Sequence, residues 1–300
     1  MKTKQHRRAF LQRSGMGILG ALVCPVPSLF ASVPRQRIEV TRFHMNMLVR
    51  LTAYVDDKEN GLQILRNAFE EILRYEKIFS AFDRSSELSQ ACKDAHLSPL
   101  AVSPALFEVL SSAQSLANQS KGAFDPTIGP VLKLWRQAQL SGIPPKPAEI
   151  ETQLDFCGYE NMILNPEGKT VSLLKEHMQI DLGAIAKGYI GDRIIGYLKE
   201  QGIASAAYHA GGDIVTGNAP PDTEGWIIDM PGQSGPWVIS DEALSISGDS
   251  YQHFDFEGTR YSHVINPVSG QALTGSKQSV CKASSGLLAD TLATTQLMLE

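Results

Sequence analysis

The most informative stretch of this sequence is the run Asp181-Leu182-Gly183-Ala184-Ile185-Ala186-Lys187-Gly188. It is typical of a strand end followed by a helix, which we expect to begin at about Gly183 and to end near Gln201. Unpaired N–H groups at a helix start favour an anion, and Lys187, one turn inside, can add a positive charge for a phosphate. Asp181 can accept hydrogen bonds from a ligand hydroxyl. The alternative is an ordinary helix-start acid and a solvated lysine.

Hydrophobic periodicity on both sides of this run predicts helices before it and mostly short strands after it. The predicted helices span about 57–79, 103–120, 126–140 and 183–201, with a last helix from about 285. The predicted strands lie in 36–55, in a pair within 161–174, and at 204–209, 213–217, 225–230, 236–240, 243–247, 252–257, 260–265 and 277–283. We expect a loop at 141–149. This order predicts an α+β fold, with one domain over 34–300 and mixed or antiparallel sheets flanked by helices.

The composition is that of a globular protein. The chain has 300 residues, of which 43% are apolar and 20% charged, and this excludes a disordered, collagen-like or polytopic membrane chain. Residues 1–33 contain five of the 27 basic residues and no acidic one, so the remainder carries 22 bases against 32 acids, a net charge of −10. An acidic body without a basic cluster cannot supply the counterion release that dominates nucleic-acid binding, so we expect no nucleic-acid partner.

Residues 1–33 are predicted to be an export signal. A basic start precedes an uncharged stretch, and the run Arg7-Arg8-Ala9-Phe10-Leu11-Gln12 resembles a twin-arginine signal, which indicates a periplasmic protein. The alternative is a membrane anchor, but glycines and prolines interrupt a segment barely long enough to span a bilayer. Cys24 lies in a context similar to a lipoprotein box, yet Val23 stands where a small residue is needed, which disfavours lipid attachment.

Two acceptor oxygens one turn apart on the last predicted helix form a candidate metal site. Asp290 and Thr294 have the i and i+4 spacing that places both side chains on one helix face, as two ligands of a hard cation require. Mg²⁺ is the metal we expect, because zinc would call for histidine and cysteine ligands. The alternative is a helix-start acid followed by a threonine bonded to its own helix.

A histidine on a predicted strand is the best candidate for a general base. His263 lies in the run 258–267, and a neutral imidazole near pH 7 can take a proton from a hydroxyl. His209 and His253 are weaker rivals, and a structural histidine is the alternative for all three.

Two glycine-containing turns complete the candidates. In Gly122-Ala123-Phe124-Asp125-Pro126-Thr127 the aromatic ring can pack on a planar ligand, and Asp125 is predicted to be the N-cap of a helix with Pro126 in its first position. The glycines of Ala210-Gly211-Gly212-Asp213 permit a close backbone approach to a ligand, although a simple turn also explains them. The sequence contains no Walker loop, G-x-G-x-x-G, G-x-S-x-G or H-E-x-x-H motif.

Taken together and in order, these elements closely resemble the ApbE family of FAD:protein FMN transferases. The resemblance covers roughly residues 38–300, and the Asp181–Gly188 run is one of its two most specific parts. The elements that carry it are Met45, Ser86-Glu87-Leu88, Gly122 to Thr127, Asp181 to Gly188, Gly211-Gly212-Asp213, Ser247-Gly248-Asp249, Tyr261-Ser262-His263, Asn266-Pro267, Ala289-Asp290 and Ala293-Thr294.

The resemblance implies an enzyme that binds FAD with Mg²⁺ and transfers FMN to a threonine or serine hydroxyl of an acceptor protein, releasing AMP. It implies that His263 deprotonates this hydroxyl. The implied metal ligands are Asp290, Thr294 and the carbonyl of Ala184, and the implied FAD contacts are Met45, Phe82, Ala123, Phe124, Asp125, Asp181, Lys187 and Val264.

Three positions depart from the family pattern. The usual Met-Gly-Thr is Met45-Asn46-Met47, Phe82 stands where many members have a ring-stacking tyrosine, and Asn266 replaces an aspartate before the proline. Phe82 keeps a stacking surface and loses only the phenol hydroxyl.

The resemblance also implies a partner and leaves two competing functions open. Exported members act on electron-transfer subunits that face the periplasm, so we expect an acceptor of that kind, with peripheral association with the inner membrane as an open alternative. The competing functions are an Mg²⁺-dependent FAD pyrophosphatase that yields FMN and AMP, and a non-catalytic periplasmic flavin-binding protein.

Overall fold

The fold is organised around a six-stranded sheet with the order β1-β2-β6-β7-β10-β14, in which every neighbouring pair is antiparallel. The computed structural model describes residues 35–229, 235–248, 253–275 and 277–299, so the predicted signal at 1–33 and Asp249 lie outside the described residues. The six strands are Gln36–His44, Met47–Val55, Ala206–Ala210, Asp213–Thr216, Ala243–Gly248 and Gln278–Ala283.

A tight hairpin opens the sheet where the sequence predicted a single extended segment over 36–55. The segment is divided at Met45 and Asn46, which have φ values of 50° and 58°, and His44 pairs directly with Met47. A two-residue turn with both central residues in the left-handed region matches the twist of the flanking strands. Asparagine tolerates this conformation better than most residues, so Asn46 suits the turn where the family has glycine.

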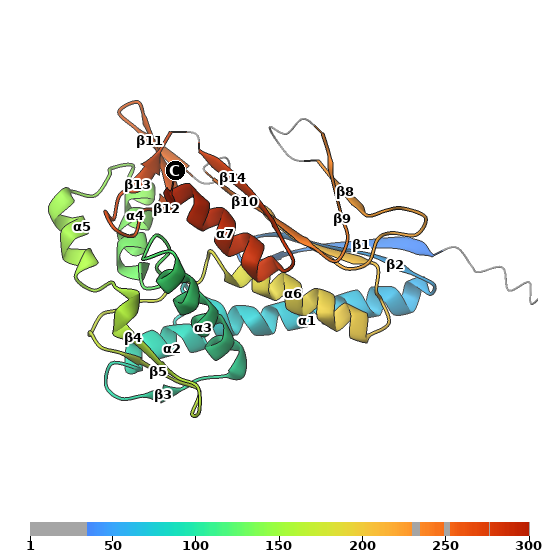
Figure 1. The fold of residues 1–300 in the computed structure, drawn as a ribbon, viewed down its shortest axis with the longest axis horizontal. Helices are drawn as coiled ribbons and strands as arrows, with labels where there is room; N and C mark the ends of the chain where they lie inside the picture. The colour runs from blue at the N-terminus through green and yellow to red at the C-terminus, as the bar shows by residue number, and fades with distance from the viewer. Residues whose placement is uncertain (1–34, 230–234, 249–252, 276, 300) are drawn as a thin grey trace, which may run out of the picture. The chain divides into compact units, whose positions relative to one another are not determined.

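Three helices cover one face of the sheet. Figure 1 shows α1 (Lys58–Phe79), α6 (Ala186–Glu200) and α7 (Gly286–Leu299) running along it, with α6 in contact with both of the others. Helices α6 and α7 approach closely where two glycines meet, because a Cβ on Gly188 would lie 2.0 Å from the carbonyl oxygen of Gly286. This contact places the second turn of α7 beside the start of α6.

The opposite face of the sheet is covered by a small hairpin of β8 (Trp226–Ile228) and β9 (Trp237–Ile239). Trp226 and Ile239 are buried there against side chains of the six-stranded sheet. The sheet is therefore apolar on both faces, with its larger core on the helical side.

Two further layers flank this centre. One contains β3 (Leu100–Ala101), β4 (Met162–Asn165) and β5 (Thr170–Leu173) with α2 (Glu87–Asp94) and α3 (Pro104–Gln119). The other contains β11 (His253–Phe256), β12 (Thr259–Ile265) and β13 (Ala272–Thr274) with α4 (Gly129–Ser141) and α5 (Pro147–Leu154). The short 3₁₀ helix η1 (Tyr159–Asn161) precedes β4. Trp135 of α4 packs against Phe254 and Tyr261.

The predicted α+β class is confirmed, and the corrections concern element ends and small elements. Helix α5 occupies part of the predicted loop 141–149, because Pro147 begins a helix and Glu149 accepts a hydrogen bond from the N–H of Lys146. Helix α2 and strand β13 were not predicted. Helix α6 begins at Ala186 rather than Gly183, after a turn. Within the described residues, no helix combines the length and hydrophobicity needed to cross a membrane.

Candidate active site

The centre of the candidate site is a buried ion cluster at the junction of α6, α7 and β7. The ammonium of Lys187 donates to both carboxylate oxygens of Asp290, at 3.0 and 3.1 Å, and lies 3.2 Å from an oxygen of Asp213. The same ammonium donates to the carbonyl of Gly183 at 2.6 Å. The N–H of Gly188 donates to Asp290 at 3.2 Å. Three distant segments of the chain therefore meet at one lysine.

Backbone geometry explains how these segments meet. Asp192 of α6 accepts hydrogen bonds from the N–H groups of Gly286 at 2.6 Å and Leu287 at 3.0 Å, so one helix caps the start of the other. Asp213 follows the Gly211-Gly212 turn, where Gly211 has a φ of 61° and a Cβ on Gly212 would lie 2.5 Å from the carbonyl oxygen of Ile246. The glycines that sequence analysis treated as a turn thus bring Asp213 to the cluster.

Burial and like charge govern the electrostatics of the cluster. Burial raises the pKa of Asp290 to about 7, and the neighbouring Asp213 adds to the increase, while Lys187 opposes it. Burial alone would lower the pKa of Lys187, but the Asp213 and Asp290 carboxylates outweigh burial and raise it. With all three groups ionised, the cluster contains two negative charges and one positive charge. The excess negative charge attracts a second cation.

The oxygen donors beside the cluster suit a hard cation. Thr294 lies one helical turn after Asp290, is half-buried, and shares a hydrogen bond of 2.8 Å with the hydroxyl of Ser247. Ala184 belongs to the turn that also contains Gly183, whose carbonyl receives the Lys187 ammonium. Carboxylate, hydroxyl and carbonyl oxygens fit Mg²⁺, which keeps several waters or ligand oxygens. Among the described residues, no group of three or more His, Cys, Asp or Glu side chains could hold a metal.

The predicted anion site at the helix start is corrected in one respect. The N–H of Gly183 donates to Asp181 at 2.9 Å, and the N–H groups of Ile185 and Ala186 donate to the carbonyl of Leu182. These backbone groups are satisfied within the protein, because the residues before α6 form a turn instead of a first helical turn. The ammonium of Lys187 is also engaged within the protein, by Asp290, Asp213 and Gly183, so its contact with a phosphate stays a prediction.

A second cluster joins Asp181 to Phe82 through a residue that sequence analysis missed. Arg136 of α4 donates to a carboxylate oxygen of Asp181 at 2.6 Å, and its guanidinium carbon lies 4.4 Å from the centre of the Phe82 ring. Asp181 is nearly buried, whereas Phe82 is 64% exposed. The structure therefore brings together two of the predicted flavin contacts, and no local sequence signal pointed to Arg136.

The Gly122–Thr127 loop is positioned differently from the prediction. Asp125 is not the helix cap: its carboxylate accepts from the N–H (2.8 Å) and hydroxyl (2.6 Å) of Thr127 and from the N–H of Tyr159 (3.1 Å), and α4 begins later, at Gly129. Burial raises the pKa of Asp125. Phe124 is buried in the main core, so its ring packs against protein side chains, and Ala123 is half-buried. Their contact with FAD stays a prediction.

Met45 lies at the hairpin turn, where Glu76 of α1 anchors it. Glu76 accepts a hydrogen bond from the N–H of Met45 and pairs with the ring of His44 at 2.7 Å. The side chain of Met45 is half-buried and packs on the main core. The departure at Met45-Asn46-Met47 therefore keeps a defined turn.

His263 and Val264 are adjacent on β12, with His263 exposed and Val264 buried. This strand belongs to the β11-β12-β13 sheet rather than to the sheet that carries Asp213. The role of His263 as the general base stays a prediction. The rival His209 is engaged at both ring nitrogens, by Arg50 at 2.7 Å and by the carbonyl of Gly211 at 2.9 Å, and burial lowers its pKa. Its environment is that of a structural histidine.

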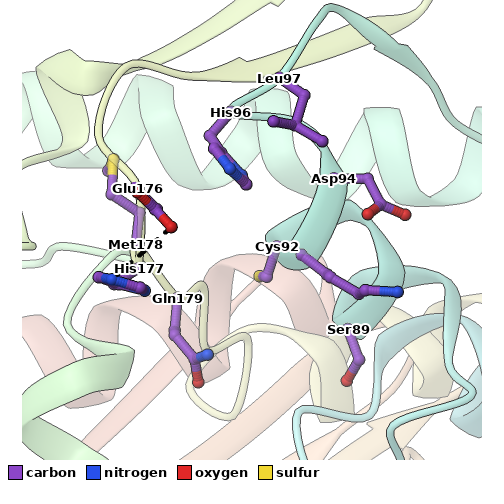
Figure 2. A pocket seen from close by; sticks show the side chains of 10 residues that line it. Ser89, Cys92, Asp94, His96, Leu97, Glu176, His177, Met178 and Gln179 are labelled. Atoms are coloured by element: carbon purple, nitrogen blue, oxygen red, sulfur yellow. Dashed lines mark ion pairs between the residues drawn. The ribbon is translucent and has the colours of Figure 1, made fainter.

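A cavity of about 420 Å³ opens beside the segment that leads into Asp181. Figure 2 shows His96 and Cys92 from the α2 side facing Met178 and Gln179 on the opposite segment. The thiol of Cys92 accepts from the N–H of Ile180 at 3.2 Å, and burial raises its pKa to about 11, which keeps it protonated. None of the predicted site residues lines this cavity.

The sequence model described as the ApbE family matches residues 45–300. The FAD:protein FMN transferase of Klebsiella pneumoniae is 30% identical over 230 residues, covering 76% of this chain and 73% of that protein. The protein of the same name from Vibrio cholerae is 32% identical over 225 residues, covering 72% and 67%.

Two solved structures have a similar fold. The flavin transferase ApbE from Vibrio cholerae matches with a TM-score of 0.77 and 25% identity, covering 89% of this chain and 88% of that chain. The ApbE protein from Thermotoga maritima matches with a TM-score of 0.79 and 27% identity, covering 88% and 87%.

Proposed function

The chain belongs to the ApbE family, and from that premise we propose that it is an Mg²⁺-dependent enzyme that transfers FMN from FAD to a threonine or serine hydroxyl of an acceptor protein. Transfer of FMN from FAD to an acceptor protein is the function carried by its relatives' names. One observation supports placing this reaction in the chain: Lys187, Asp290 and Asp213 form a buried ion cluster, and Thr294 lies beside it.

We assign the ion cluster and the oxygens beside it to the pyrophosphate end of FAD. The ammonium of Lys187 is engaged by Asp290, Asp213 and the carbonyl of Gly183, so we assign Lys187 the role of holding the Asp290 carboxylate and the Gly183–Ala184 turn in place beside the pyrophosphate of FAD. Asp290, Thr294 and the carbonyl of Ala184 would hold the metal. Mg²⁺, when bound, neutralises the pyrophosphate charge that builds up as the bond to AMP breaks.

His263 of β12 is exposed, which supports an encounter with an acceptor protein. We assign it the proton of the acceptor hydroxyl. The hydroxyl oxygen then forms a bond to the FMN phosphorus, the pyrophosphate bond breaks, and AMP leaves.

For cellular location we propose export to the periplasm, with an electron-transfer subunit that faces the periplasm as acceptor and peripheral contact with the inner membrane. The support is the basic start of the chain, the uncharged stretch that follows it and the twin-arginine-like run at residues 7–12. Fractionation of cells that express the full chain, compared with an Arg7→Lys, Arg8→Lys variant, tests this proposal. Loss of periplasmic protein in the variant is expected, and equal export of both would contradict it.

The decisive experiment for the function is a labelling assay. The protein is mixed with FAD, Mg²⁺ and an acceptor domain that contains a flavinylation threonine, and a denaturing gel is viewed under ultraviolet light. We expect a fluorescent acceptor band that disappears with EDTA and with Asp290→Asn. Glu151→Gln, an exposed position on α5, is the matched control and should label normally.

The same reaction separates the competing functions. Free FMN and AMP without a labelled acceptor would indicate a pyrophosphatase, and intact FAD with several acceptors would indicate a protein that only binds flavin. Either result would contradict the proposed transfer.

A further inference from the structure

Arg136 of α4 contacts two of the predicted flavin-binding residues, Asp181 and Phe82, and belongs to none of the sequence motifs. Its guanidinium carbon lies 4.4 Å from the centre of the Phe82 ring, within the range of a cation–π contact. Phe82 is 64% exposed, and Arg136 links its ring to the nearly buried carboxylate of Asp181. A planar ligand stacked on this ring would cover its exposed face.

Arg136 also controls Asp181. One oxygen of Asp181 accepts from Arg136 at 2.6 Å and the other accepts from the N–H of Gly183 at 2.9 Å, so both carboxylate oxygens are oriented. The main-chain N–H of Asp181 donates to the carbonyl of Pro126 at 2.8 Å, which ties this segment to the loop before α4. A single side chain on α4 thus connects the segments around residues 82 and 181.

The position of Arg136 decides which face of the Phe82 ring a ligand can contact. With the guanidinium over one face of the Phe82 ring, only the opposite face is open for a planar ring to stack on. Stacking of aromatic rings depends on a fixed orientation, and a side chain with one face held loses less rotational freedom when a ligand binds.

We propose that Arg136 is a positioning residue for FAD: it presents Phe82 as a one-sided stacking surface and fixes the orientation of the Asp181 carboxylate. This proposal rests on the proposed function for the identity of the ligand. Arg136 acts through its two neighbours, so its removal should weaken FAD binding and leave the chemical step intact.

The test is FAD binding by the full chain without acceptor, measured by calorimetric titration in Mg²⁺ buffer, together with steady-state labelling. For Arg136→Met we expect the Kd and KM for FAD to rise about tenfold, which corresponds to about 1.4 kcal/mol, with kcat at saturating FAD within about twofold of wild type. Arg136→Lys keeps the charge beside Asp181 but not the planar contact with Phe82, so it should recover part of the affinity.

The chain offers a closely matched control. Arg193 also lies over an aromatic ring, 4.8 Å from the centre of Tyr189, and also pairs with a carboxylate, that of Glu108. Arg193→Met removes the same type of contact from another part of the surface, and FAD affinity should stay within about twofold of wild type. An equal loss in both variants would show a general stability effect and overturn the proposal.

A double-mutant cycle tests whether the effect passes through Phe82. In a Phe82→Leu background, Arg136→Met should cost less than about threefold in Kd, because the stacking surface is already gone. A full tenfold loss there would refute the action of Arg136 through Phe82, and FAD binding by folded Arg136→Met at wild-type strength would refute the positioning role as a whole.

The outcomes for this proposal and for the proposed function are separate. Arg136-dependent FAD binding without acceptor labelling by the wild type would contradict the transferase and support Arg136. If the wild type labels the acceptor and Arg136→Met binds FAD with unchanged affinity, the transferase is supported and the role of Arg136 is contradicted.

Discussion

Replacement of Lys187 by methionine tests the buried cluster most directly, because it removes the only cation that contacts both carboxylates among the described residues. The side chain of Lys187 is 23% exposed, while those of Asp213 and Asp290 are 4% and 2% exposed. Methionine fills a similar volume, so the change is mainly one of charge. The two carboxylates are then left facing each other in a site with little water.

The magnitude follows from burial. Removing one partner of a fully buried pair typically costs about 3–5 kcal/mol, because an uncompensated charge remains. Lys187 retains some solvent contact and Asp290 can take up a proton, so we expect a loss of about 2–3 kcal/mol at pH 8. For a domain of this size that lowers the Tm by roughly 4–12 °C.

The assay is urea unfolding followed by circular dichroism, in EDTA and in Mg²⁺. In EDTA, Lys187→Met should unfold at a lower urea concentration than the wild type. Mg²⁺ should restore more of the lost stability in the variant than it adds to the wild type, because a cation again faces Asp290. The control is Lys199→Met on the same helix, whose exposed pair with Asp241 should contribute at most about 1 kcal/mol.

Two results would refute this reasoning. A Lys187→Met protein as stable as Lys199→Met would show that the buried carboxylates do not depend on the ammonium. Equal stabilisation of the wild type and the Lys187 variant by Mg²⁺ would show that the metal does not bind at this cluster.

Three further changes test other parts of the site. Gly188→Ala should lower the unfolding free energy by at least about 1–3 kcal/mol and reduce labelling, because its Cβ would lie 2.0 Å from the Gly286 carbonyl oxygen; wild-type stability would contradict the close helix contact. Asp213→Asn should raise the KM for FAD about tenfold by loosening Lys187, measured by labelling kinetics, and an unchanged KM would count against its role. Burial raises the pKa of Asp125, so the folded state favours the protonated carboxyl and the wild type loses stability as the pH rises. Asparagine does not titrate, so the difference in unfolding free energy between the wild type and Asp125→Asn should shrink between pH 4 and pH 8 in urea titrations. A difference that grows with pH would contradict this prediction.

The local elements were the most predictable part of this protein. Ser103 caps α3 with its hydroxyl and Pro104 opens the helix, as the residue types predict. The helical spacing in 57–79 corresponds to α1 within one residue at its start. These signals depend on backbone preferences and on which face of an element is apolar, so neighbouring residues are sufficient to reveal them. The three prolines near residue 145 concealed α5 because proline occurs both in loops and in the first turn of helices.

The site was predictable as a set of residues but not as an arrangement. Family resemblance pointed to Lys187 and Asp290, and the twin-arginine-like leader stays a prediction. The lysine and the aspartate are 103 residues apart, and they form one ion cluster because Gly188 and Gly286 allow the two helices to approach closely. No local sequence pattern predicts this contact. Arg136 has no sequence signal at all, since its importance arises only when α4 packs beside the segment at Asp181. Backbone preferences act over a few residues, whereas pairing between distant side chains is decided by how helices and strands pack.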